Sequence, residues 1–286
     1  MVRTFPRIRN LFFYTFMIIL AMITLFPFLW LLITSFKHPI EIFSTTPTFF
    51  PNDFTFDNYK FFFTGFDERR GIRIPIQKAF VNSIIIALGT SLISVFVGTC
   101  AAYAIARRKL KWMLSVLVII IGIRTIPRIS IVIPLYLFIQ KLGLLDTLFG
   151  VMISHITFTL PIATFMMYSF FNDIPVSLEE AATVDGATRM QSFLKIIIPI
   201  VTPGLAVAMI LSFVFSYNDF LYALVLVSTP NAMTLPVALS QFILQFGIAW
   251  ELMASIGTLA TIPVIIFSFI VQKNIVKGLT LGAEKG

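Results

Sequence analysis

The sequence has few charged residues and almost no cysteine. Only 12% of its 286 residues are charged, whereas 58% are hydrophobic. A soluble domain of this length would need many more charges on its water-facing shell, so the composition excludes an ordinary soluble protein. The single cysteine, Cys100, excludes a disulfide framework and a cysteine-based metal site. The composition therefore predicts a membrane protein that uses the bilayer as its apolar solvent.

The sequence also lacks the motifs that carry nucleotide hydrolysis or covalent catalysis. It has no G-x-x-x-x-G-K-[ST] phosphate loop, no H-E-x-x-H and no G-x-S-x-G, and its two histidines are His38 and His155. No catalytic residue, metal site or resident cofactor is therefore expected. If the protein moves a solute uphill, the energy must come from an ion gradient or from another subunit.

Basic residues outnumber acidic ones, which leaves a net charge of +8. They gather in short clusters between apolar runs, in residues 1–10, 107–111 and 273–286. Such clusters mark cytoplasmic loop ends under the positive-inside rule. The pattern therefore predicts cytoplasmic segments beside membrane lipid, and no nucleic-acid partner.

Six apolar stretches reach the length of about 20 residues that a membrane-spanning helix needs. They are Leu11–Phe36, Phe80–Ala106, Trp112–Phe138, Leu148–Phe171, Ile196–Val227 and Leu252–Gln272. An even number of spans places both termini on one side, the cytoplasm. The sequence thus predicts an all-α membrane protein with one transmembrane domain over residues 1–286. Its parts outside the spans are a cytoplasmic N-terminus (1–10), a proline-rich outer loop (37–79), a cytoplasmic loop (172–195) and a cytoplasmic tail (273–286). A short helical stretch, Pro236–Phe246, is too short to cross and lies at the outer interface or folds back into the bundle.

The cytoplasmic loop 172–195 has a strong local pattern. Ser177 and Glu180 have the spacing of a capping box, and Gly186 suits the residue just past a helix end. We therefore expect a helix of about two turns, a glycine corner and a second helix toward Pro199. The first helix offers small or apolar residues, namely Leu178, Ala181, Ala182 and Val184. Because a lone short helix is unstable in water, this segment is predicted to dock onto another protein.

The same loop carries a family resemblance. Glu180-Ala181-Ala182, followed by Gly186 and by Ile196-x-Ile198-Pro199, resembles the EAA loop of ABC importer permeases. The usual pattern ends I-x-L-P, so Ile198 stands where leucine is common. Four further segments resemble maltose-type carbohydrate permeases: Asn58-Tyr59, Ile133-Pro134-Leu135-Tyr136, Asn218-Asp219-Phe220-Leu221 and Gly278-Leu279-Thr280-x-Gly282.

This resemblance implies a type I ABC importer permease fold in a bacterial or archaeal cytoplasmic membrane. The implied partners are a second homologous permease, two ATPase subunits that bind ATP and Mg²⁺, and an extracytoplasmic solute-binding protein. The residues implied to couple to the ATPase are Ser177, Leu178, Glu179, Glu180, Ala181, Ala182, Asp185, Gly186, Ala187 and Pro199. The tail residues implied to reach the ATPase are Gly278, Leu279, Thr280, Gly282 and Lys285. A loop at Gln245, Phe246 and Gly247 is implied to contact the binding protein.

Three charged residues, Arg124, Arg128 and Asp219, fall within or near apolar spans, where a central charge costs about 2.5–3.5 kcal/mol. If the helices are straight, Arg124 lies roughly 18 Å above Trp112, Arg128 lies one turn further on the same face, and Asp219 lies near the outer surface. With Asn218, these groups are candidates for the solute path. The alternative is an Arg–Asp pair that fixes helix packing or a subunit interface.

The function predicted from these features is the permease subunit of an ATP-driven, binding-protein-dependent importer for a sugar or oligosaccharide. Within that class, the cargo can also be a polyol, glycerol phosphate or another polar solute. An ion-coupled secondary transporter would need paired acidic sites on broken helices. An intramembrane enzyme would need a nucleophile–base or metal set, and the sequence shows neither feature.

Overall fold

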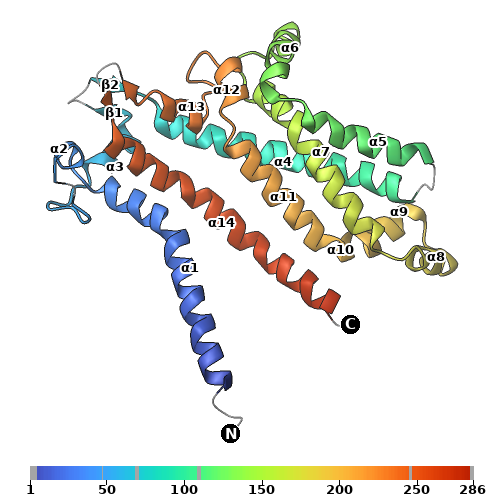
Figure 1. Ribbon diagram of the computed structural model, residues 1–286. Helices are drawn as coiled ribbons and strands as arrows, with labels where there is room; N and C mark the ends of the chain where they lie inside the picture. The colour runs from blue at the N-terminus through green and yellow to red at the C-terminus, as the bar shows by residue number, and fades with distance from the viewer. Residues whose placement is uncertain (1–4, 47, 68–70, 108–110, 245–246, 284–286) are drawn as a thin grey trace. The chain divides into compact units, whose positions relative to one another are not determined.

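The computed structural model (Figure 1) describes residues 5–46, 48–67, 71–107, 111–244 and 247–283, which are almost entirely helical. The longer helices are α1 (Phe5–Ser35), α4 (Ile76–Arg107), α5 (Lys111–Gly122), α6 (Arg128–Lys141), α7 (Leu148–Asn172), α11 (Thr202–Tyr217) and α14 (Trp250–Ala283). The short helices are α2 (Pro39–Ile42), α3 (Asp57–Thr64), α8 (Ser177–Val184), α9 (Arg189–Ser192), α10 (Ile198–Ile200), α12 (Leu221–Leu226) and α13 (Leu235–Ser240). Two antiparallel hairpins pair β1 (Phe66–Asp67) with β2 (Ile72–Arg73), and β3 (Ile243–Leu244) with β4 (Gly247–Ile248).

Within the described residues, 4 helices are long and apolar enough to cross a membrane, and the number rises to 6 if each of two bent helix pairs is one span. The all-α membrane fold is therefore confirmed, and the six predicted stretches match these segments. The placement of both termini in the cytoplasm stays a prediction.

The third predicted span, Trp112–Phe138, is broken at Pro127, a proline that by its chemistry is expected to kink or break a helix. Helix α5 passes into a 3₁₀ turn at Ile123–Thr125, and α6 begins at Arg128 after a bend of 100°. Pro127 explains the break, because proline disfavours helical geometry in the residue before it and lacks an amide donor. Ile126 accordingly has an extended backbone, with ψ of 125°.

The fifth predicted span, Ile196–Val227, is also interrupted. The segment Arg189–Ile200 meets α11 at a bend of 72° near Val201. Pro203 accounts for this bend, since it cannot donate to the carbonyl four residues earlier and its ring crowds that carbonyl. Helix α11 then ends at Tyr217, and the chain turns through residues 218–220 before α12.

The chain divides into two compact units, and the first comprises residues 1–74 and 239–262. Buried Asn58 is central to it, because its amide nitrogen donates to the carbonyls of Ser35 and Lys37, at 2.9 Å each. Ser255 donates in turn to the Asn58 carbonyl at 3.0 Å. The described part of the segment 37–79 is partly packed and contains α2, α3, the first hairpin and the start of α4, while its predicted place outside the membrane stays a prediction.

Helix α1 of this unit has an apolar surface that the chain itself does not cover. The 18-residue window that identifies its span is 0% buried, and the span Asn10–Ser35 carries no charged residue. An apolar helix exposed over this length requires lipid or another subunit around it.

The predicted short helix Pro236–Phe246 is shorter than expected, since α13 ends at Ser240 and a hairpin follows.

The second unit comprises residues 75–238 and 263–286, and its helices α4, α7 and α11 pack against one another. Their shared core is formed by Val95, Ala102, Ala163, Met167, Phe171, Ile174, Ile197, Val201 and Ala208. A Cβ on Gly98 would lie 3.0 Å from the backbone nitrogen of Thr164, so glycine permits the close approach of α4 and α7. A hydrogen bond of 2.7 Å between Ser94 and Thr159 crosses the same interface. All the polar sites described below lie in this unit.

Candidate functional site

Helix α8 is a two-turn helix closed by a glycine corner, as the sequence predicted. Gly186 has φ of +85°, a conformation that glycine adopts without a Cβ penalty. The corner is held by Ala187, whose amide donates to the Ala182 carbonyl at 2.9 Å, and by the Gly186 amide, which donates to Thr183 at 3.1 Å. These bonds satisfy carbonyls that the helix end would otherwise leave unpaired.

The predicted capping box at Ser177 and Glu180 is wrong. The residue before the helix is Val176, and no side chain caps this end. The capping box occurs instead one helix later, where the Thr188 hydroxyl accepts from the Gln191 amide and the Gln191 side chain accepts from the Thr188 amide. Thr188-x-x-Gln191 has the capping-box spacing too, so the signal was present in the sequence but was not used.

Helices α8 and α9 expose several large apolar side chains. Val184 is 86% exposed, Met190 is 64% exposed and Leu178 is 44% exposed, whereas Ala182 is buried. Glu180, Ala181 and Asp185 are also exposed. Projecting apolar side chains on a short helix favour a protein partner, so the docking role stays the preferred prediction for this surface.

The Glu179 side chain is largely buried, whereas its neighbour Glu180 is exposed. Its carboxylate pairs with the Arg107 guanidinium and accepts from the Tyr103 hydroxyl at 2.6 Å. Arg107 and Tyr103 lie near the end of α4, and the sequence analysis treated Arg107 only as part of a basic cluster. Their spacing of four residues, which places both side chains on one helix face, was the available signal. A cavity of about 450 Å³ adjoins this contact and is also lined by Glu180 and Arg189.

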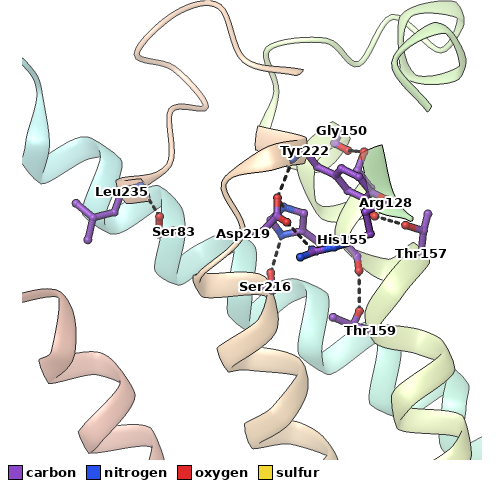
Figure 2. Close-up of polar contacts among 11 residues, drawn as sticks. Ser83, Arg128, Gly150, His155, Thr157, Thr159, Ser216, Asp219, Tyr222 and Leu235 are labelled. Atoms are coloured by element: carbon purple, nitrogen blue, oxygen red, sulfur yellow. Dashed lines mark hydrogen bonds and ion pairs between the residues drawn. The ribbon is translucent and has the colours of Figure 1, made fainter. Parts of the chain in front are cut away.

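A second polar cluster surrounds Asp219, just past the end of α11 (Figure 2). The Asp219 side chain is 0% exposed and accepts from Arg128 at 2.8 Å and from the Tyr222 amide at 3.0 Å. The Nε2 atom of buried His155 lies 3.3 Å from the second carboxylate oxygen, and its Nδ1 lies 2.8 Å from the Ser216 hydroxyl. The cluster therefore joins the start of α6, the middle of α7 and the turn after α11.

The two arginines of the third span do not share one face of one helix, as a straight helix would require. Arg124 lies in the 3₁₀ turn and Arg128 begins α6 beyond the bend, yet both line a cavity of about 250 Å³. Each guanidinium lies near an aromatic ring: Arg124 is 5.9 Å from the centre of Phe215, and Arg128 is 5.0 Å from that of Phe158. Thr157 and Tyr222 complete the polar lining and share a hydrogen bond.

The positions of Arg124, Arg128 and Asp219 can be compared with the two interpretations of these charges, a solute path and a packing ion pair. The Arg128–Asp219 pair required by the packing interpretation is present, while Arg124 lines the cavity as the solute-path interpretation requires. Asn218 is exposed, and its side chain bonds back to the Val214 carbonyl at 2.9 Å. Contact of these residues with solute stays a prediction.

A third polar network connects loops that precede and follow the spans. Asp146 accepts from the amides of Ser228 and Thr229, at 3.0 Å each, and from the Thr229 hydroxyl at 2.5 Å. Burial opposes ionisation of Asp146, but these hydrogen bonds and the nearby charge of Lys78 hold its pKa below the ordinary value. Asp146 also has a positive φ of 57°, which few residues other than glycine, asparagine and aspartate adopt.

Two sets of predicted contact residues are only partly described. Gln245, Phe246 and Lys285 lie outside the described residues. The backbone of Gly247 belongs to β4, and Gly278, Leu279, Thr280 and Gly282 belong to the last turns of α14. The tail therefore continues as helix past the predicted span end at Gln272.

These features define a multi-pass helical membrane protein with a short exposed helix between two of its spans. The chain belongs to the family described as binding-protein-dependent transport system inner membrane component, whose model matches residues 94–281. Its similar proteins are named as transport system permeases.

Similar proteins support this assignment. The trehalose transport system permease protein SugB of Mycobacterium tuberculosis is 40% identical over 264 residues, covering 92% of this chain and 93% of that protein. The trehalose/maltose transport system permease protein MalG of Thermococcus litoralis is 34% identical, covering 94% of each. A chain in the crystal structure of a bacterial ABC transporter involved in the import of the acidic polysaccharide alginate superposes with a TM-score of 0.75, at 24% identity, over 96% of this chain and 98% of that one. Because the sequence identity to the alginate transporter chain is only 24%, this match is evidence for the fold alone.

Proposed function

We propose that this chain is a permease subunit of an ATP-driven importer for a sugar or oligosaccharide in a bacterial or archaeal cytoplasmic membrane. The cargo is inferred from relatives named for trehalose and for trehalose/maltose transport. The single structural observation that carries the mechanism is the exposed helix α8 with its glycine corner. It offers apolar side chains outward while its base is fixed to the membrane helices.

In this proposal the assembly contains a second, homologous permease, two ATPase subunits and an extracytoplasmic solute-binding protein. ATP and Mg²⁺ bind to the ATPase subunits. Closure of the ATPase pair pushes on α8 and α9, with Glu180, Asp185 and Gly186 at the contact. The membrane helices then rock between inward-facing and outward-facing states, and no residue of this chain performs covalent chemistry.

Three further assignments belong to the same proposal. The tail residues Gly278, Leu279, Thr280, Gly282 and Lys285 contact the ATPase, and the hairpin containing Gly247 contacts the binding protein. Arg124, Arg128 and Asp219, with Asn218, border the path of the solute. The cavity beside Arg124 supports the last assignment, since it combines polar donors with aromatic faces.

Copurification and reconstitution of the complete complex test the proposal. ATP hydrolysis and uptake should both rise when binding protein loaded with one member of a panel of mono-, di- and oligosaccharides is added. Solute accumulation by this chain alone, without an ATP-hydrolysing companion, would contradict the mechanism.

A second candidate cargo is an anionic polar solute such as glycerol phosphate. The observation that favours it is Arg124, which lines the cavity and for which no ion pair is found in the described part of the chain. Glycerol phosphate and a polyol should therefore be included in the panel. Stimulation by glycerol phosphate but by no saccharide would replace the sugar assignment while leaving the importer class intact.

A further inference from the structure

Arg107 connects three helices through one guanidinium group. Its Nε donates to the Glu179 carboxylate on α8, and its Nη1 donates to the Phe171 carbonyl at 2.9 Å. Its Nη2 makes a longer contact of 3.4 Å to the Ile174 carbonyl. The Phe171 carbonyl belongs to the last turn of α7, and the Ile174 carbonyl belongs to the linker that follows it. We call Arg107, Glu179, Tyr103 and these two carbonyls the Arg107 junction.

The surroundings of the Arg107 junction restrict its movement. The side chains of Arg107 and Glu179 are only 12% and 16% exposed, so water screens their attraction less than on an open surface. The Tyr103 ring packs against Phe171 and Phe193, with centroid distances of 5.5 Å and 4.5 Å. Its hydroxyl meanwhile donates to Glu179 at 2.6 Å. The acid is thus held by two partners from a single helix face, and one of them is fixed by aromatic packing.

The chain connections alone would couple α8 weakly to the membrane helices. Four residues, 173–176, join α7 to α8, and the Gly186 corner joins α8 to α9. Few loop residues are enough to absorb a rigid-body motion as a hinge. Among the side chains of α8, Ala182 alone is buried, and it is too small to resist such motion. The ion pair at Glu179 therefore supplies the directional connection that the backbone lacks.

We propose that the Arg107 junction transmits the displacement of α8 to α4 and α7 together, with Glu179 and Arg107 as positioning residues for transport. This inference rests on the proposed function, in which an ATPase pushes on α8. It divides the two adjacent acids between two tasks, since Glu180 is exposed and accessible to a partner whereas Glu179 is paired with Arg107 of α4.

The test uses the complete complex in proteoliposomes and measures ATP hydrolysed per solute taken up. Glu179→Gln removes the charge but keeps the shape, and because a broken buried pair is costly it should raise this ratio roughly tenfold. ATP hydrolysis itself should persist, and so should the amount of assembled complex. Arg107→Gln should have a similar effect, and the double variant should be no worse than either single one, because all three lose the same interaction.

Two variants separate coupling from stability. Tyr103→Phe keeps the aromatic packing and removes one hydrogen bond, so it should raise the ratio about twofold to fivefold and remain assembled even if Glu179→Gln does not. Lys60→Gln removes an exposed ion pair with Asp57 in the other unit and should leave the ratio unchanged. A lowered melting temperature with an unchanged ratio in the assembled Glu179→Gln or Tyr103→Phe complex would overturn the inference. A wild-type complex that never couples ATP hydrolysis to uptake would overturn the proposed function as well.

Discussion

The α8–α9 segment and the cluster around Asp219 both lie in the second unit, and they are built in opposite ways. The α8–α9 segment is local: its turn, its capping box and its glycine corner join residues at most five positions apart. The cluster around Asp219 is non-local: Arg128 is 91 residues from Asp219, and His155 is 61 residues from Ser216. The first region exposes most of its side chains, whereas the second buries Asp219 and His155.

This difference explains how each region can serve transport. A surface that another protein grips needs a fixed local shape, which short-range hydrogen bonds supply. A buried charged group needs partners from several helices, because hydrocarbon offers it no solvation. Mutations should therefore change docking in one region and packing in the other.

The largest effect is expected from Gly186→Val. A Cβ at Gly186 meets no atom within 4 Å, but φ is +85°, so the cost is backbone strain of about 1–3 kcal/mol. Uptake in proteoliposomes should fall roughly tenfold or more, while membrane insertion and ATP hydrolysis persist. Gly186→Asn is the matched control, because asparagine tolerates this conformation and should retain most uptake. Normal uptake by the valine variant would count against the docking role.

Asp219→Asn should have the next largest effect, on stability rather than docking. The substitution leaves Arg128 and His155 beside a neutral amide. Because Arg128 is half-exposed and water still solvates it, we expect the free energy of unfolding to fall by only about 2 kcal/mol. Thermal unfolding of the purified complex measures this loss.

Asn218→Ala is the matched variant for Asp219→Asn. The Asn218 side chain is exposed and bonds only to its own helix in the described contacts, so its removal should leave the melting temperature unchanged. An equal loss of stability in both variants would contradict the central role of Asp219. A loss of uptake by Asn218→Ala at full stability would support the solute path.

A smaller difference is expected between the two candidate caps. Thr188→Ala removes a side-chain cap and should destabilise the start of α9 by about 1 kcal/mol. Ser177→Ala removes no cap and should stay within about 0.5 kcal/mol of wild type. Hydrogen exchange of the amides of residues 189–192 compares the two variants, and equal protection in both would show that the capping box contributes nothing.

The smallest effect is a pH dependence at Asp146. Because the folded state lowers its pKa, its contribution to stability is present above the unfolded pKa of about 3.9 and is lost as pH falls through the lower folded value. The difference in melting temperature between wild type and Asp146→Asn should thus be constant from about pH 8 to 5 and should shrink below about pH 4. Asparagine is the suitable replacement because it accepts the positive φ of this position. A difference that grew on acidification would contradict the lowered pKa.

Several elements were predictable because their causes are short-range. Hydropathy located the apolar segments, and glycine at position 186 predicted the corner. Pro127 predicted a kink or break in its helix, but proline is tolerated in membrane helices and does not by itself distinguish a mild kink from a bend of 100°. The bend near Val201 was missed. The pairing of Glu179 was missed as well, since its partner Arg107 is 72 residues away.

The amino-acid sequence alone determines the membrane environment, the apolar segments and the shape of the short exposed helix. Each of these depends on residues within a few turns of one another in the sequence. Tertiary structure alone decides which charges meet: Arg128 with Asp219, and Arg107 with Glu179 rather than Glu180. The physical reason is that an ion pair depends on distance in space. That distance is set only when α4, α6, α7 and α11 have packed.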